Sequence, residues 1–309
     1  MGQLDTVQLL QSESNRDSII QLTSNDSILT AESIEAGKQK NQANRFSSNL
    51  RFAQYLITQE LYNDAEFLLM GLASDSSVSN DKMDSATYLL AWLQYFQRDF
   101  DEALYITSRI SNESSIYNTS AFLGATCYLY LEQFEKSKEI YENLTELSDG
   151  EEAVRMLNLA GIALLTRSYA EYDSINNLLP QNNYLIATET RSLESYANDM
   201  TSYKRKSPFL AGLLSAIVPG LGKYYVGYRG TPFGALTLNV PLAAIAVETL
   251  IITGWTGIPF LIAAPLFGVF YLGNIWGSAL SPYAHQREFY DEMDHNILYD
   301  LHIPVRRLF

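Results

Sequence analysis

The chain has 309 residues, a formal net charge of −14 and 18% charged residues. An acidic balance of this size argues against nucleic acid as a partner, because the phosphates need lysine and arginine to neutralise them. The single cysteine, Cys127, excludes an internal disulfide, and its apolar helical surroundings predict a small core residue.

The charge is divided unevenly along the chain. Residues 1–200 hold 13 Lys and Arg against 29 Asp and Glu, a net charge of −16. Residues 201–309 hold 8 against 6, a net charge of +2. From residue 230 to residue 284 the only acidic or basic side chain is Glu248. The sequence therefore predicts a soluble acidic part followed, from about residue 204, by a membrane-seeking part.

The first segment, residues 1–45, is polar and only weakly periodic. It is rich in Ser, Asn and Gln, which predicts one or two loosely held helices. No basic stretch followed by an apolar stretch marks a signal peptide. The first six residues fit the pattern for N-myristoylation, although a trimmed start is the simpler interpretation.

Residues 46–203 contain an internal repeat. Four segments align without gaps, and each places an aromatic residue nine positions after a small one. The aromatic residues follow one another at intervals of 38, 34 and 35 residues. The small residues are Ala53, Ala91, Ala125 and Ala160, and the aromatic residues are Tyr62, Phe100, Phe134 and Tyr169. Small residues at a fixed position indicate helices that cross closely.

This repeat resembles the tetratricopeptide repeat, a helical hairpin of about 34 residues. The resemblance implies an all-α, tetratricopeptide-like solenoid in which the stacking of hairpins supplies the core. The fourth segment departs from the pattern at Tyr172 and is expected to be a degenerate cap. A stretch near 185–203 is predicted to be a helical cap or connector. An irregular helical bundle is the alternative to the solenoid.

A solenoid of this family offers a concave groove to a peptide or helix of another protein. The first helix of each hairpin would line that groove. The candidate partner-binding residues are Gln54, Tyr55, Trp92, Gln94 and Asn158.

The membrane part is predicted to cover residues 204–285. Two stretches, about 233–253 and 258–280, reach the length of about 20 apolar residues that a bilayer span requires. A short turn with Trp255 joins them into a transmembrane helical hairpin with both ends on one side. The earlier stretch 208–218 is too short to cross, so it is expected to be interfacial or re-entrant. A buried soluble hairpin is the alternative.

The stretch KSPFLAGLLSAIVPGLGKYYVGYRG (206–230), followed by FYLGNIWGSA (270–279), resembles the membrane segment of a family of bacterial envelope proteins. Those proteins pair an exported repeat domain with a C-terminal hairpin. PGLGKYYVG (219–227) is also similar to the glycine–aromatic signature of two-span TM2 domains. The resemblance implies the bacterial inner membrane, a periplasmic repeat domain, and a role in envelope assembly or in membrane-protein insertion or secretion.

The orientation of the hairpin stays open at this stage. The lysines and arginines of the C-terminal part lie on the side of the hairpin ends. The positive-inside rule assigns that side to the cytoplasm, whereas the family resemblance assigns it to the periplasm.

Two groups of residues in the membrane part predict contacts. Lys223, Tyr224, Tyr225 and Arg229 are expected to anchor at the interface or to contact lipid headgroups. Gly273, Gly277 and Ser281 recur every four residues and form a small-residue face beside Asn274. Such a face allows close helix packing, either within the hairpin or against another membrane protein.

No catalytic, metal or cofactor site is predicted. His285, His295 and His302 fit no compact zinc spacing, and residues 286–309 are expected to be a solvated polar tail. The sequence predicts a membrane-anchored scaffold, not an enzyme, whose partners are the lipid bilayer and another protein or membrane complex. The alternatives are an oligomeric transporter using Glu248 and Asn239, or a membrane-bound enzyme acting on lipid or cell wall.

Overall fold

The computed structural model describes residue 38 and residues 40–180 and 183–308. These residues are helical and contain no strand, which confirms the all-α class. The chain divides into two compact units, Met1–Leu147 and Ser148–Phe309. Most of the predicted N-terminal segment 1–45 lies outside the described residues.

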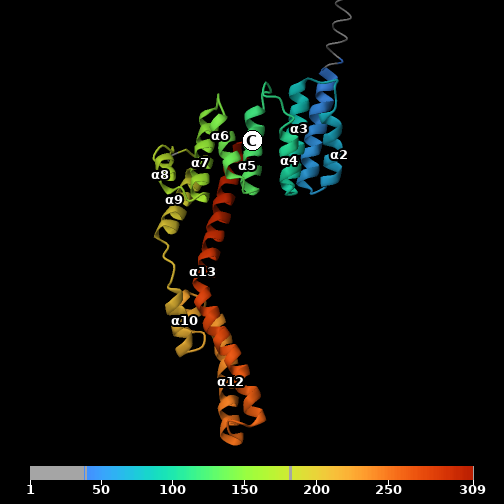
Figure 1. The fold of residues 1–309 in the computed structure, drawn as a ribbon. Helices are drawn as coiled ribbons and strands as arrows, with labels where there is room; N and C mark the ends of the chain where they lie inside the picture. Colours follow the sequence, from blue (N-terminus) through green and yellow to red (C-terminus); the bar gives the residue numbers. More distant parts are fainter. Residues whose placement is uncertain (1–37, 39, 181–182, 309) are drawn as a thin grey trace, which may run out of the picture. The chain divides into compact units, whose positions relative to one another are not determined.

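The first unit is a series of helices in which each packs on the next (Figure 1). Its helices are that of residues 40–58, α2 (Tyr62–Ala73), α3 (Asn80–Phe96), α4 (Phe100–Thr107), α5 (Tyr117–Tyr130) and α6 (Phe134–Asn143). Its largest buried side chains include Leu69, Leu93 and Leu123. Burial raises the pKa of the Cys127 thiol to about 12, so Cys127 is the core residue that the sequence predicts.

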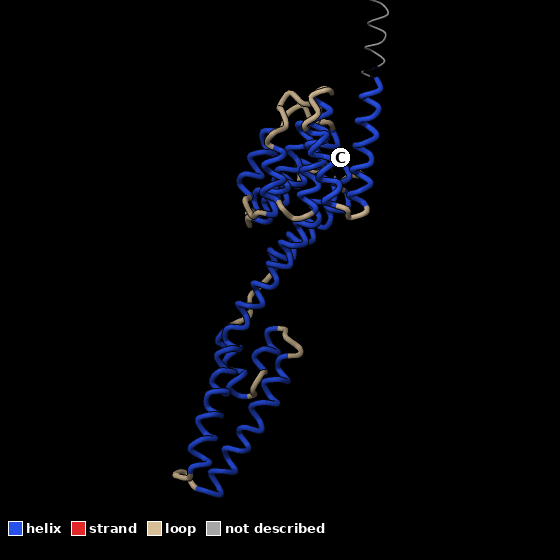
Figure 2. Tube along the Cα trace, turned by 90° about the vertical axis from the view of Figure 1, so that its right-hand side faces the viewer, coloured by secondary structure: helices blue, strands red, loops and turns tan. Residues whose placement is uncertain are grey.

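The second unit joins the fourth helical pair to the apolar helices. It contains α7 (Asp149–Leu165), α8 (Tyr169–Asn176), α9 (Ala187–Ser202), α10 (Pro208–Ile217), α11 (Leu221–Val226), α12 (Thr231–Thr253) and α13 (Ile258–Leu308). Helix α13 has 51 residues and packs on α10, α11 and α12, and also on α7 and α9. Figure 2 shows the helical hairpin that α12 and α13 form. The fourth predicted repeat therefore shares a unit with the apolar helices, not with the first three repeats.

The register of the repeat is confirmed in the helix boundaries. The four predicted aromatic residues are the first residues of α2, α4, α6 and α8. The four predicted small residues are all fully buried: Ala53, Ala91, Ala125 and Ala160. Tyr172, where the other segments have Ala or Ser, is buried as well. The assignment to the tetratricopeptide family remains a prediction.

Each hairpin turns through a residue with left-handed backbone, two positions before the aromatic residue. These residues are Glu60, Arg98, Glu132 and Arg167, with φ of 60°, 63°, 57° and 62°. The next amide donates to the carbonyl five residues back, at 3.0, 3.0, 2.9 and 2.7 Å in the four turns. This is the Schellman bond that closes a helix C-terminus. The repeat is thus a repeat of backbone geometry as well as of residue types.

A left-handed backbone costs a side-chain-bearing residue about 1 kcal/mol or more, and glycine adopts it freely. Arg98→Gly should therefore raise the free energy of unfolding by about 0.5–1 kcal/mol, as measured by chemical denaturation of the full chain in detergent. The control Arg51→Gly, inside the helix of residues 40–58, should lower it by about 1 kcal/mol. A loss of stability in both variants would contradict this account of the turn.

Candidate functional site

The five predicted groove residues do not form one exposed surface. Gln54 and Tyr55 are exposed on the helix of residues 40–58. Trp92 and Gln94 are buried in the first unit, and Asn158 is fully buried in the second. The expectation that all five face a partner is therefore corrected by the structure. A helix packed on both sides buries more of its circumference than a repeat pattern alone can reveal.

Internal contacts explain the burial of Trp92 and Gln94. The ring of Trp92 packs edge-on against that of Tyr95, with 5.1 Å between centroids. The Gln94 amide nitrogen donates to a Glu66 carboxylate oxygen at 2.9 Å. The Gln94 bond joins α3 to α2, whereas the Trp92 contact lies within α3.

The first unit instead exposes other aromatic and apolar side chains, which the sequence analysis missed. Phe67 is 84% exposed and Tyr105 is 62% exposed, and Phe52 and Met70 are also exposed. Phe52 stacks on Tyr55 with 6.3 Å between ring centroids. We call these four residues together with Tyr55, which the sequence did predict, the aromatic surface; they lie on the helix of residues 40–58, on α2 and on α4. Buried residues recur along each helix with a helical spacing, and these apolar side chains fall outside that spacing. An apolar residue outside the spacing is the sequence signal that could have identified them.

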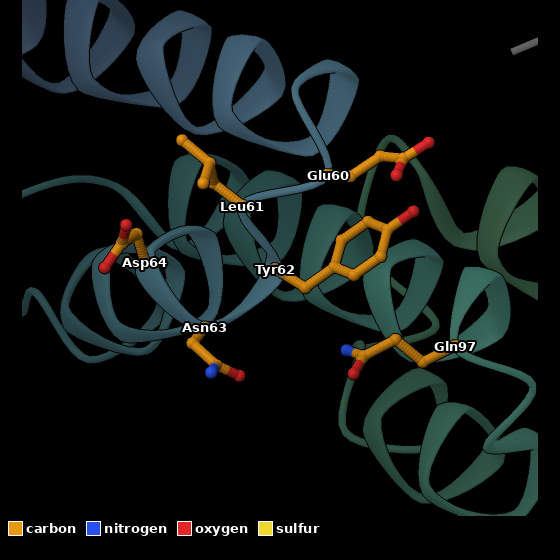
Figure 3. Close-up of a pocket in the computed structure, with 6 residues that line it drawn as sticks. All are labelled: Glu60, Leu61, Tyr62, Asn63, Asp64 and Gln97. Atoms are coloured by element: carbon orange, nitrogen blue, oxygen red, sulfur yellow. The ribbon is translucent and has the colours of Figure 1, made fainter.

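A hollow of about 320 Å³ lies at the first hairpin turn (Figure 3). Its lining residues are Glu60, Leu61, Tyr62, Asn63, Asp64 and Gln97. Figure 3 shows the Tyr62 ring between the Glu60 carboxylate and the Gln97 amide. Two carboxylates and no basic group line the hollow, so it suits a cationic side chain.

The last turns of α13 dock on α7 and α9, which corrects the expected solvated tail over 286–309. Ile297, Leu301 and Val305 recur every four residues and are buried. Leu301 fills the space beside Gly161 of α7, where an added Cβ would lie 2.5 Å from a Leu301 methyl carbon. A polar composition concealed this narrow apolar stripe, because the other faces of the helix carry the charges.

Three polar contacts fix this docked segment. The Arg167 guanidinium donates to both carboxylate oxygens of Asp294 at 2.7 Å. The Tyr196 hydroxyl donates to Asp300 at 3.0 Å, and Arg307 donates to the buried Glu189 at 3.1 Å. A bidentate arginine–carboxylate pair fixes direction as well as distance.

Two pKa shifts accompany the docking. Burial disfavours the charged form of Arg167, but the hydrogen bonds and charge of Asp294 outweigh it, so the pKa of Arg167 is raised. The pKa of His302 is lowered, first by burial and then by the nearby Arg306 cation. His302 is half-buried, whereas His295 is exposed on α13.

Helices α10 and α11 form a hairpin that lies along α13. The Ser215 hydroxyl donates to that of Ser278 at 2.7 Å and accepts from the Gly222 amide at 2.9 Å. The Tyr271 hydroxyl donates to the Ala216 carbonyl. These bonds satisfy polar backbone at the turn between α10 and α11. Helix α10 runs beside residues 271–279 of α13, and its interfacial or re-entrant placement remains a prediction.

Helix α13 continues through Pro282, although the second span was predicted to end near 280. Proline has no amide hydrogen and leaves the carbonyl four residues earlier, that of Ser278, without its helical donor. The Ser281 hydroxyl donates to that carbonyl at 2.7 Å. Ser281, predicted to pack against another helix, therefore satisfies the backbone where proline interrupts the helix.

The other predicted packing residues separate into two sets. Asn274 is buried, with no hydrogen-bond partner among the described residues. Gly273 is exposed, and an added Cβ at Gly273 or Gly277 would meet nothing within 4 Å. The small-residue face at Gly273 and Gly277 is therefore not used for packing within the chain.

The predicted interface residues lie on α11 and just after it. Lys223 and Tyr225 are half-buried, and Tyr224 and Arg229 are exposed. The Tyr225 hydroxyl accepts a hydrogen bond from the Ser207 amide at 3.4 Å. On α12, Glu248 is exposed and Asn239 is buried.

No protein-family model matches the chain, and no curated protein or solved structure matches it significantly. Among the described residues, no group of three or more His, Cys, Asp or Glu side chains could hold a metal ion.

Gly161→Val should displace the docked segment, because its side chain would occupy the space of Leu301. We expect hydrogen exchange over residues 294–308 to accelerate at least tenfold, as measured by mass spectrometry of the full chain. Adding Leu301→Ala should restore part of the protection by vacating that space. The exposed α8 position Ala170 lacks this neighbour, so unchanged exchange in Gly161→Val, as in an Ala170→Val control, would contradict the docking.

Proposed function

We propose that the chain is a membrane-anchored scaffold whose helical hairpins bind a partner protein and position it at a bilayer. It acts by binding, with no covalent chemistry. One observation carries the proposal: α13 begins in an exposed apolar helix pair and ends in buried contacts on α7 and α9. A single helix thereby joins the anchor to a folded helical domain.

Exposed apolar surface supports the anchor. The stretches Phe233–Thr253 and Ile258–Arg307 are long and apolar enough to cross a membrane, and the most apolar 18-residue window in each has a mean hydropathy of 1.9 and 1.8. Only 11% of the most apolar window in each is buried within the protein. Apolar surface in water costs about 25 cal/mol per Å², a cost that a bilayer removes. The bacterial inner membrane is the proposed bilayer, on the resemblance of residues 206–230 and 270–279.

The aromatic surface supports partner binding. Aromatic side chains dominate protein interfaces because they bury large areas with few rotatable bonds. Residues 38–147 hold 9 Lys and Arg against 15 Asp and Glu, a net charge of −6. The hollow at the first turn adds the carboxylates of Glu60 and Asp64. We therefore expect the partner segment to carry apolar and basic side chains.

The proposal is tested with photoreactive amino acids at positions 67 and 105 of the full chain in cells. Both positions should crosslink to the same protein, and a control at Tyr184, equally exposed in the second unit, should not. Phe67→Ser with Tyr105→Ser should abolish co-purification of that protein, while the chain stays in the membrane fraction after alkaline extraction.

Two results would contradict the proposed function. Release of the wild-type chain by alkaline extraction would contradict the proposed membrane anchor. Absence of a common crosslinked protein from positions 67 and 105 would contradict the proposal that the aromatic surface binds a partner.

A further inference from the structure

An apolar groove of about 250 Å³ lies between α10 and α13. The side chains that line it include Phe209, Leu213 and Ala216 of α10 and Ile275 and Ala279 of α13. None of its lining residues is charged. Gly212 forms the base of this groove, because its missing side chain lets α10 approach Ala279 closely. The groove therefore suits an unbranched hydrocarbon chain.

Two cations lie at one end of this groove. Arg205 and Lys206 precede Pro208, the first lining residue in the chain, with only Ser207 between them. The Arg205 guanidinium lies 4.4 Å from the centroid of the Tyr283 ring. Tyr283 is one helical turn beyond Ala279 and on the same face of α13. The end of the groove toward residue 283 is therefore cationic.

Arg205 and Lys206 each lie against an aromatic ring, and neither is paired with a described carboxylate. The Lys206 ammonium lies 5.5 Å from the Tyr225 ring centroid, and Arg205 also donates to the Gln286 amide oxygen at 3.5 Å. Residues 203–230 contain five Lys and Arg and no Asp or Glu. Neither Arg205 nor Lys206 forms an ion pair with a described carboxylate.

We propose that the groove, with Arg205 and Lys206, binds one anionic glycerophospholipid. An acyl chain lies along α10 and α13, and the phosphate group contacts the two cations. The guanidinium is suited to this role because its fork of donors matches phosphate oxygens. The inference rests on the proposed membrane anchor, since the cations lie where the apolar part of α13 ends and a headgroup would be.

The proposal predicts a preference among lipids. Each basic side chain near an anionic membrane surface strengthens association by about fivefold. Arg205 and Lys206 together should therefore favour phosphatidylglycerol over zwitterionic phosphatidylcholine by about tenfold or more. The preference should weaken as salt rises, because exposed charges are screened.

The test is native mass spectrometry of the purified full chain, titrated in detergent with dioleoylphosphatidylglycerol or dioleoylphosphatidylcholine. Arg205→Gln with Lys206→Gln should reduce phosphatidylglycerol binding about tenfold and leave phosphatidylcholine binding unchanged. The control Arg45→Gln with Arg51→Gln removes the same charge from exposed positions in the first unit. It should bind both lipids as the wild type does.

A second variant tests the groove independently. Ala216→Trp fills the groove and should weaken binding of both lipids about tenfold. The control Ala244→Trp, at an exposed position on α12, should not. Unchanged melting temperatures and elution volumes verify the fold of each variant.

Equal binding of both lipids by the wild type would overturn the proposal, as would a phosphatidylglycerol preference that survives Arg205→Gln with Lys206→Gln. If Ala216→Trp binds normally while the charge variant does not, the cations bind a headgroup alone and the groove assignment is overturned. Failure of the wild-type chain to incorporate into phosphatidylcholine nanodiscs would count instead against the anchor.

Discussion

Leu301 occupies the space that a side chain at position 161 would take, and the docking of the α13 end on α7 and α9 depends on this close approach. Ile297 and Val305 extend the contact by one helical turn on either side. Apolar burial supplies the free energy, and the Arg167–Asp294 pair supplies direction. Without this contact the turns of α13 beyond Pro282 would be a solvated extension of an apolar helix.

Because α13 remains a helix across Pro282, its apolar part and its docked end belong to one continuous helix. The Ser281 hydroxyl takes the helical acceptor that proline leaves free, so a residue expected to bind another helix instead preserves this one. The hairpin of α10 and α11 follows the same rule at its turn, where Ser215 and Tyr271 bond to backbone groups. Polar side chains of the apolar segments thus serve internal packing, and the outer faces at Gly273 and Gly277 remain available.

The sequence predicted the parts of the fold that depend on local geometry. The spacing of Tyr62, Phe100, Phe134 and Tyr169 located four second helices, because each of these residues follows a left-handed turn. The apolar lengths predicted the two candidate spans. The candidate site was predicted less well. Trp92 and Asn158 were expected at a surface and are buried, because the packing on each face of a helix depends on distant elements.

The docked end of α13 shows the same limit. Its partners on α7 and α9 are more than 100 residues away in the sequence, and only four-residue spacing of Ile297, Leu301 and Val305 hinted at a buried stripe. Glu189 and Asp300 likewise carried no signal of pairing until their partners were placed.

The most direct test of the account is a disulfide between cysteines placed at positions 161 and 301 of the full chain in isolated membranes. Replacement of Leu301 opens room for both thiols, and Cys127 is buried and does not compete. The account predicts a rapid intramolecular crosslink in the membrane fraction, seen as a mobility shift that reductant reverses. Absence of the crosslink, with both thiols open to alkylation, would contradict the linkage of the apolar hairpin of α12 and α13 to the helical domain.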